Sequence, residues 1–193
     1  MKKWRTAFLM VCIACLLCAC QKETDVDTNT VIIDKKGQIT EAIVEEFNQP
    51  YYDLDELKSD IEGQIASYNA QSGSEEAVIL DKIELTEQTV HVNLIFADYN
   101  AYTGFNEKEL FAGTVADAYS AGYEFPQMKQ TDGTVISQAD VLELGEKHVV
   151  IMEELQQVKV PGRITHISDG VSLVDDKTAI NLNEGQTAFI IYE

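Results

Sequence analysis

The sequence predicts an α+β fold, in which an antiparallel sheet with one main helix is followed by a β-rich C-terminal unit. Apolar and polar residues alternate along 89–97, as in a strand with one buried face, and an apolar run at 77–85 supplies a partner strand. A helix-start pattern at Asp53 precedes this pair. After Pro126, short apolar runs separated by glycines indicate strands and tight turns.

The first predicted element is an apolar segment at 31–33. A turn at 34–37 follows, and a second apolar segment covers 39–47. These features favour a β-hairpin, because Gly37 can adopt a positive φ in the turn. The spacing of Ile39, Ile43 and Phe47 also suits a helix, so both structures remain open for the second arm.

The main helix is expected to begin at Asp53, whose side chain can cap the free backbone amides of the first turn. Apolar residues at helical spacing follow on one stripe and charged or polar residues on the other side. The stripe, predicted to face the core, consists of Leu57, Ile61, Ile65 and Tyr68.

The N-terminal residues have the features of a secretory signal, with basic residues at positions 2, 3 and 5 before an apolar run at 7–17. The run ends in Leu17-Cys18-Ala19-Cys20, which resembles the lipobox of bacterial lipoproteins. The resemblance implies diacylation of Cys20, cleavage before it, and anchoring to the cell membrane on its extracytoplasmic side. An uncleaved membrane span is the alternative, but the uncharged apolar segment is shorter than the roughly 20 residues that a span needs.

These features divide the chain into a signal peptide (1–19), a lipidated Cys20 with a polar tether (20–29), an α+β domain (30–125) and the β-rich unit (126–193). All four cysteines lie at or before position 20, so the exported part is expected to fold without disulfides. It also has no thiol for catalysis or metal binding.

The exported part is strongly acidic. The signal holds three of the 14 basic residues, which leaves 11 against 33 acidic residues and a net charge of −22. Such a charge repels nucleic acid and anionic lipid headgroups, so nucleic acid is excluded as a partner. Neutral or cationic ligands are favoured.

Aromatic residues are concentrated between Phe96 and Phe125, where Asn100, Thr103, Gly104, Asn106 and Gly113 are expected to break regular structure. Rings held on such loops, beside amide side chains, are typical of a groove for a carbohydrate or a peptide. A loop-rich core patch is the alternative. The residues predicted to bind a ligand are Tyr99, Tyr102, Tyr119 and Tyr123.

Catalytic and metal-binding patterns are weak. Ser120 lies in a segment that resembles a nucleophile elbow, and Asp140, His148 and His166 follow in the order of a hydrolase triad, but the parallel sheet that an elbow requires is not predicted. The three histidines share no close spacing, so no metal ligands or cofactor are predicted. We therefore expect a non-enzymatic binding or interaction protein of the cell envelope, whose partner is an envelope protein, a peptide or a glycan. A purely structural accessory and a hydrolase are the alternatives.

Overall fold

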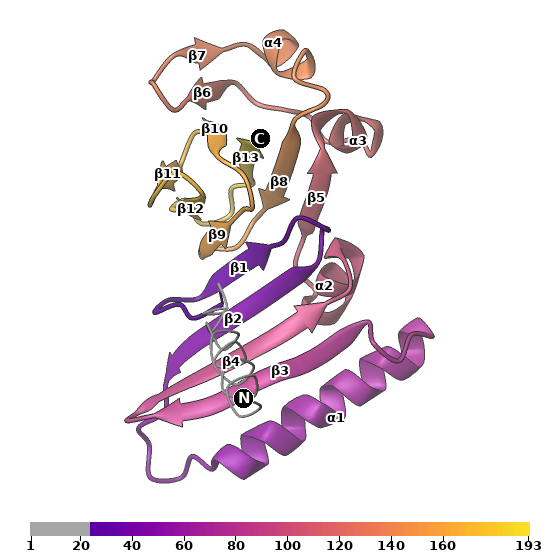
Figure 1. Ribbon diagram of the computed structural model, residues 1–193, viewed down its shortest axis with the longest axis vertical. Helices are drawn as coiled ribbons and strands as arrows, with labels where there is room; N and C mark the ends of the chain where they lie inside the picture. Colours follow the sequence, from indigo (N-terminus) through magenta and orange to yellow (C-terminus); the bar gives the residue numbers. More distant parts are fainter. Residues whose placement is uncertain (1–23) are drawn as a thin grey trace, which may run out of the picture.

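The computed structural model describes residues 24–193, which form two sheets and four helices (Figure 1). The helices are α1 (Leu54–Ser72), α2 (Tyr99–Asn106), α3 (Val115–Ser120) and α4 (Gln138–Leu142). The helix α1 has 19 residues, whereas the others have eight or fewer. This architecture confirms the predicted α+β class with one main helix.

The first sheet has seven strands. Their spatial order is β11 (Val171–Leu173), β12 (Thr178–Asn181), β9 (Gln157–Lys159), β1 (Thr30–Ile33), β2 (Ile39–Glu46), β4 (Thr89–Phe96) and β3 (Val78–Thr86). Neighbouring strands are antiparallel except β1 and β9, which are parallel.

The predicted hairpin is present as β1 and β2. Its second arm, for which the sequence allowed either a strand or a helix, is the strand β2. The Asp34 carboxylate fixes its turn by accepting hydrogen bonds from the backbone N–H groups of Lys36 (2.7 Å) and Gln38 (2.9 Å). Gly37 has φ +82°, a conformation that costs glycine little.

The second sheet has six strands, and it is mainly C-terminal. Their order is β5 (Leu110–Thr114), β8 (His148–Met152), β13 (Ala188–Tyr192), β10 (Ile164–Ser168), β6 (Met128–Gln130) and β7 (Val135–Ile136). Two pairings join the segments that the sequence separated at residue 126, because β5 pairs with β8 and β1 pairs with β9. The two predicted units thus share both sheets.

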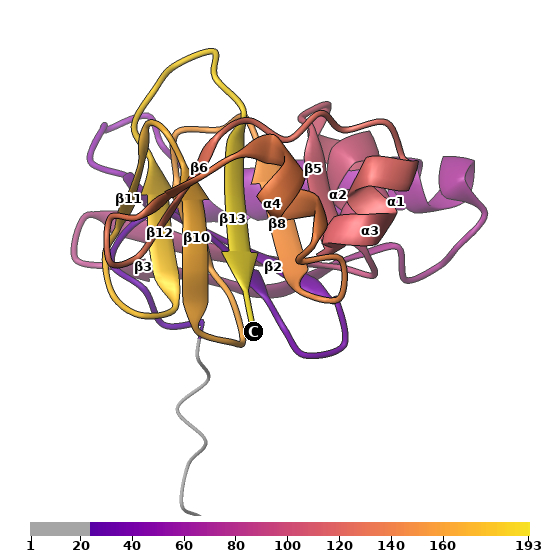
Figure 2. The same ribbon diagram turned by 90° about the horizontal axis from the view of Figure 1, so that it is seen from above.

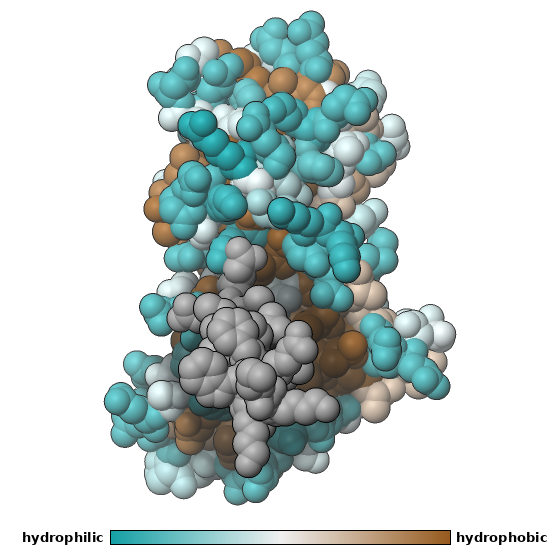
Figure 3. Space-filling model, in the orientation of Figure 1, coloured by the Kyte–Doolittle hydropathy of each residue, from teal (hydrophilic) through white to brown (hydrophobic). Residues whose placement is uncertain are grey.

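The central strands β8 and β13 of the six-stranded sheet are buried on both faces, which explains their continuous apolar runs. Alternate residues, Val150 and Met152 among them, join a core shared with the seven-stranded sheet. Their neighbours, Val149 and Ile151, join a second core under α3 and α4. Figure 2 shows these two helices over β5 and β8. The outer surface of this end of the molecule, around β6, β7 and α4, is largely hydrophilic (Figure 3).

The helix α1 runs beside β3, the terminal strand of the seven-stranded sheet (Figure 1). Asp53 caps it as predicted, accepting from the backbone N–H groups of Asp55 (2.8 Å) and Glu56 (3.1 Å). Its apolar stripe packs against the main core, and Ile65 is buried there. Gly104 of α2 lets α1 approach closely, because a Cβ at this position would lie 2.5 Å from the Tyr68 hydroxyl.

Asn69 connects α1 to the edge of β3. Its Oδ1 accepts from the backbone N–H of Val78 (3.0 Å), and its Nδ2 donates to the carbonyls of Val78 and Glu75 (both 2.9 Å). The side-chain amide therefore satisfies both backbone groups of Val78. A groove of about 670 Å³ lies next to this contact, between α1 and β3.

Candidate functional site

The aromatic segment contains the helix α2, where the sequence predicted interrupted structure. Asp98 caps this helix by accepting from the backbone N–H of Ala101 at 2.9 Å. Tyr102 and Phe105 pack against Phe96, with ring centroids 5.1 and 5.8 Å away. Tertiary packing of this kind outweighs the weak helix propensity of asparagine, threonine and glycine, which is why the expected breaks do not occur.

The four tyrosines predicted to bind a ligand lie in three different settings. Tyr99 and Tyr123 line one open cleft of about 620 Å³. Tyr102 is 0% exposed, so it cannot contact a ligand at the surface. Tyr119 is 58% exposed on α3 and is not part of the lining of this cleft. The predicted ligand-binding role is therefore wrong for the buried Tyr102, whereas Tyr119 lies at the surface outside the cleft of Tyr99 and Tyr123.

The two rings of the cleft are held by Phe111, which is 3% exposed. Its ring centroid lies 5.0 Å from that of Tyr99 and 5.2 Å from that of Tyr123. The Tyr123 hydroxyl is hydrogen-bonded to Glu109, and burial followed by this contact raises the pKa of Tyr123 to about 12. The cleft thus has two tyrosine rings packed on a buried aromatic support, which reduces the entropy lost when a ligand stacks on them.

The polar residues around the cleft favour a neutral or cationic ligand. Glu107 and Glu109 contribute two carboxylates against the single ammonium of Lys108. The Thr103 hydroxyl is already engaged, since it donates to the carbonyl of Leu110 and accepts from its N–H, both at 3.2 Å. The Asn100 side chain is exposed at the rim, where its amide could bond hydroxyl or peptide groups of a ligand.

A buried polar cluster lies on another side of α2. The Tyr102 hydroxyl is 2.5 Å from Glu154 Oε2 and 3.4 Å from Glu41 Oε1. The Asn106 amide donates to Glu41 Oε2 at 3.0 Å, and the Gln156 amide donates to the Tyr102 oxygen at 3.1 Å. We call these five residues the acid cluster. It joins β2, α2 and the β8–β9 connection.

Burial controls the protonation of this cluster. Glu41 is 8% exposed, and desolvation is the main cause that raises its pKa from 4.5 to about 7. The negative charge of Glu154 raises it further, whereas hydrogen bonds from Asn106 and Tyr102 oppose the shift. Burial, and then the two carboxylates, raise the pKa of Tyr102 well above its usual range, so its hydroxyl keeps its proton.

Sequence reasoning missed Glu41, although a signal was present. Ile39, Glu41 and Ile43 alternate along β2 and therefore point to the same face. A carboxylate between two isoleucines on a buried face requires a polar partner inside the protein. The partners could not be identified from the sequence, because Tyr102 and Glu154 lie 61 and 113 positions further along the chain.

The residues of the hydrolase alternative do not meet. Ser120 donates to the Ala116 carbonyl (2.8 Å), Asp140 completes the capping box of α4 with Ser137, and the His148 ring stacks on Tyr192 (centroids 5.3 Å apart). His166 instead contacts its neighbour Thr165.

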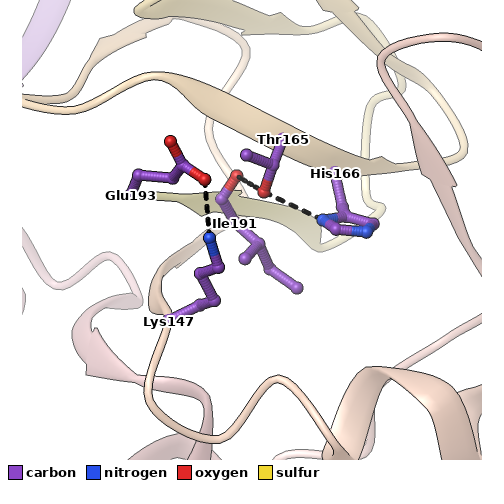
Figure 4. A network of polar contacts seen from close by, with 5 residues as sticks. All are labelled: Lys147, Thr165, His166, Ile191 and Glu193. Atoms are coloured by element: carbon purple, nitrogen blue, oxygen red, sulfur yellow. Dashed lines mark hydrogen bonds and ion pairs between the residues drawn. The ribbon is translucent and has the colours of Figure 1, made fainter.

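Figure 4 shows His166 beside Thr165, whose Oγ1 lies 2.9 Å from His166 Nδ1 and 3.3 Å from the Ile191 carbonyl. Burial, and then the Lys147 ammonium, lower the pKa of His166, so the ring is mostly neutral at pH 7. Lys147 itself pairs with Glu193 at 2.7 Å. This network packs the end of β13 and contains no activated nucleophile.

Among residues 24–193, no group of three or more histidine, cysteine, aspartate or glutamate side chains is arranged to hold a metal ion. No helix in this part of the chain is both long and apolar enough to cross a membrane. The predicted signal peptide, the lipobox and Cys20 lie outside the described residues.

Comparison with known proteins does not assign a role to the cleft or to the acid cluster. No protein-family model matches the chain, and neither the curated proteins nor the solved structures contain a match.

Proposed function

We propose that this chain is a membrane-anchored extracytoplasmic lipoprotein, and that its folded part binds a neutral or cationic ligand without catalysing a reaction. The observation that carries the binding role is the cleft in which Tyr99 and Tyr123 flank Phe111. Paired aromatic rings beside an exposed amide suit the apolar faces and hydroxyl groups of a sugar, or the side chains and backbone of a peptide.

Charge supports the same ligand class. The carboxylates of Glu107 and Glu109 are at the cleft, and the net charge of the exported part is −22. An anionic polymer would be repelled both at long range and at the site. We therefore propose a glycan or a peptide that carries no net negative charge.

A screen of neutral glycans, amino sugars and cationic peptides tests this function. For a ligand found in the screen, Tyr99→Ala and Tyr123→Ala are each expected to weaken binding roughly thirtyfold, because an aromatic anchor typically accounts for about 2 kcal/mol. Titration calorimetry measures the affinities. Tyr119→Ala is the matched control, since this tyrosine is exposed outside the cleft.

Thermal melts of the same variants separate binding from folding. Asn100→Ala supplies a second test, since this exposed side chain can be truncated without opening the core. Equal losses of affinity in Tyr119→Ala and Tyr123→Ala would contradict the site. A screen without any ligand would favour the structural accessory instead.

The anchoring role makes a separate prediction. Cys20→Ala should abolish metabolic labelling with a fatty acid, because Cys20 is the acceptor that the lipobox resemblance implies. Cys18→Ala is the control and should stay labelled. Labelling that persists in Cys20→Ala would overturn the assignment.

Anchoring at Cys20 would keep the folded part near the membrane. Asn29, in the predicted tether, is fixed to the sheet, because its Oδ1 accepts from the Val44 N–H (2.7 Å) and its carbonyl accepts from the Gln157 N–H (3.1 Å). Residues 20–28 span at most about 30 Å when extended. The cleft would therefore act close to the cell surface.

A further inference from the structure

The helix α2 connects the cleft to the acid cluster. Tyr99, Asn100 and Thr103 line the cleft. Tyr102 and Asn106, one turn apart on the same helix, contact Glu41. The helix has only eight residues, so any displacement of it would shift both sets of side chains.

The number of protons limits how the acid cluster can be hydrogen-bonded. The Tyr102 hydroxyl has one proton, so it can donate to Glu154 Oε2 (2.5 Å) or to Glu41 Oε1 (3.4 Å) but not to both at once. Both contacts can be hydrogen bonds at once only if one of the two acids carries a proton, and Glu41, which is 8% exposed, is more deeply buried than Glu154. With Glu41 protonated, the tyrosine oxygen accepts from Glu41 and Gln156 and donates to Glu154, so the cluster is satisfied.

Loss of the Glu41 proton removes this balance. Two carboxylates then face each other across one buried hydroxyl, where their repulsion is stronger than between carboxylates exposed to solvent. Asn106 still donates to Glu41, but Tyr102 cannot serve both acids. The strain can be relieved by displacing α2, which carries both Tyr102 and Asn106.

We propose that Glu41 is a proton sensor that sets the position of α2 and thereby the affinity of the Tyr99–Tyr123 cleft. The regulation of affinity rests on the proposed binding function, whereas the movement of α2 does not. The cleft seen here belongs to the protonated state, so binding is stronger in acid. By linkage, a bound ligand raises the affinity of Glu41 for its proton.

The groups that face Glu41 make Glu154 its main electrostatic partner. On the neighbouring strands, Val31 of β1 and Leu94 of β4 lie opposite Glu41, and both are apolar. The helix α2 contributes the neutral Tyr102 and Asn106, and the β8–β9 connection contributes Glu154 beside Gln156. In the described part of the chain, Glu154 is the only charged group that shifts the Glu41 pKa.

The movement of α2 can be tested without a ligand, by NMR on the chain from residue 21, which contains both sheets and both cores. The Glu41 carboxyl carbon should titrate with a midpoint near 7. The backbone amides of Asn100 and Thr103 should shift with the same midpoint. Glu41→Gln should abolish the shift of these amides, because glutamine has the shape of the protonated acid and does not titrate.

Two further variants give controls. Glu46→Gln, at the exposed end of β2, should leave the α2 titration unchanged. Glu154→Gln should lower the Glu41 midpoint, because it removes the neighbouring charge and keeps an acceptor for Tyr102. A Glu41 midpoint below 5, or α2 amides that ignore the Glu41 titration, would overturn the sensor.

The last measurement concerns affinity. A ligand from the glycan and peptide screen should bind the wild type at least tenfold more tightly at pH 5.5 than at pH 8.5, and Glu41→Gln should bind it equally at both. Equal affinities in the wild type would overturn the regulation. A screen without ligands would instead remove the binding function, and the NMR titration would still decide whether Glu41 moves α2.

Discussion

Tyr102→Ala is expected to reduce the free energy of unfolding by about 4 kcal/mol, within the range of roughly 3–5 kcal/mol measured when large buried aromatic side chains are truncated. The ring is fully buried and packs against Phe96, with centroids 5.1 Å apart. The substitution opens a cavity there and removes the hydroxyl that bonds Glu154. Urea unfolding at a fixed pH measures the loss.

Tyr102→Phe separates the two contributions, because it keeps the ring and removes only the hydroxyl. It is expected to cost about 1–3 kcal/mol, the penalty for leaving buried polar groups without a partner. Tyr119→Ala, at an exposed position, should change stability by less than about 0.5 kcal/mol. A stable Tyr102→Ala protein with a selective binding defect would contradict the core position of this residue.

The second large effect is a dependence of stability on pH that comes from Glu41. Its pKa in the folded protein, about 7, is above the ordinary value of 4.5. The folded state therefore holds this proton more tightly than the unfolded state does. The resulting stabilisation is complete below pH 4.5 and is lost as the pH rises through 7.

The size of this effect follows from the shift. At 1.36 kcal/mol per pKa unit, Glu41 contributes on the order of 3 kcal/mol between pH 4 and pH 8. Glu41→Gln should match the wild type near pH 4 and be more stable by up to about that amount at pH 8. Urea unfolding of both proteins across this range gives the difference between their free energies of unfolding. The contributions of the other titrating groups cancel in this difference.

Glu46→Gln again serves as the control, since this carboxylate is exposed on the same strand. It should follow the wild-type pH dependence. If the stability difference between Glu41→Gln and the wild type did not vary with pH, Glu41 would not be the buried acid that the structure describes.

Local patterns were sufficient to predict several elements. The alternation of apolar residues predicted β4, and Asp53 predicted the start of α1, because strand faces and helix caps are formed by neighbours in the sequence. The helix α2 was missed for the opposite reason. Its residues favour breaks locally, and it is held by packing on Phe96 and by the Asp98 cap.

The order of the strands in the two sheets could not be predicted from the sequence either. Gly113 pairs with Val149, and Thr30 pairs with Gln157, but nothing in the short strands themselves specifies partners so far away. The division at residue 126 was drawn from a change in composition, which does not report strand pairing.

The aromatic segment holds both core rings and rings at the surface, and composition did not distinguish the cleft residues Tyr99 and Tyr123 from the buried Tyr102. For Tyr99 and Tyr102, which are both on α2, the distinction depends on which side of the helix faces Phe96. The acid cluster could have been suspected from Glu41 alone. The sharing of protons within the cluster could not have been predicted, because it depends on distances among three segments of the chain.

The contact of Asn69 with Val78 has a consequence for the association of copies of this chain. An open strand edge is a template on which another strand can pair, and repeated pairing produces filaments. At Val78 the amide of Asn69 already makes the two hydrogen bonds that an incoming strand would offer. The terminal strand β3 is thereby closed at this point by a side chain of α1, which opposes growth of the sheet from one molecule to the next at Val78.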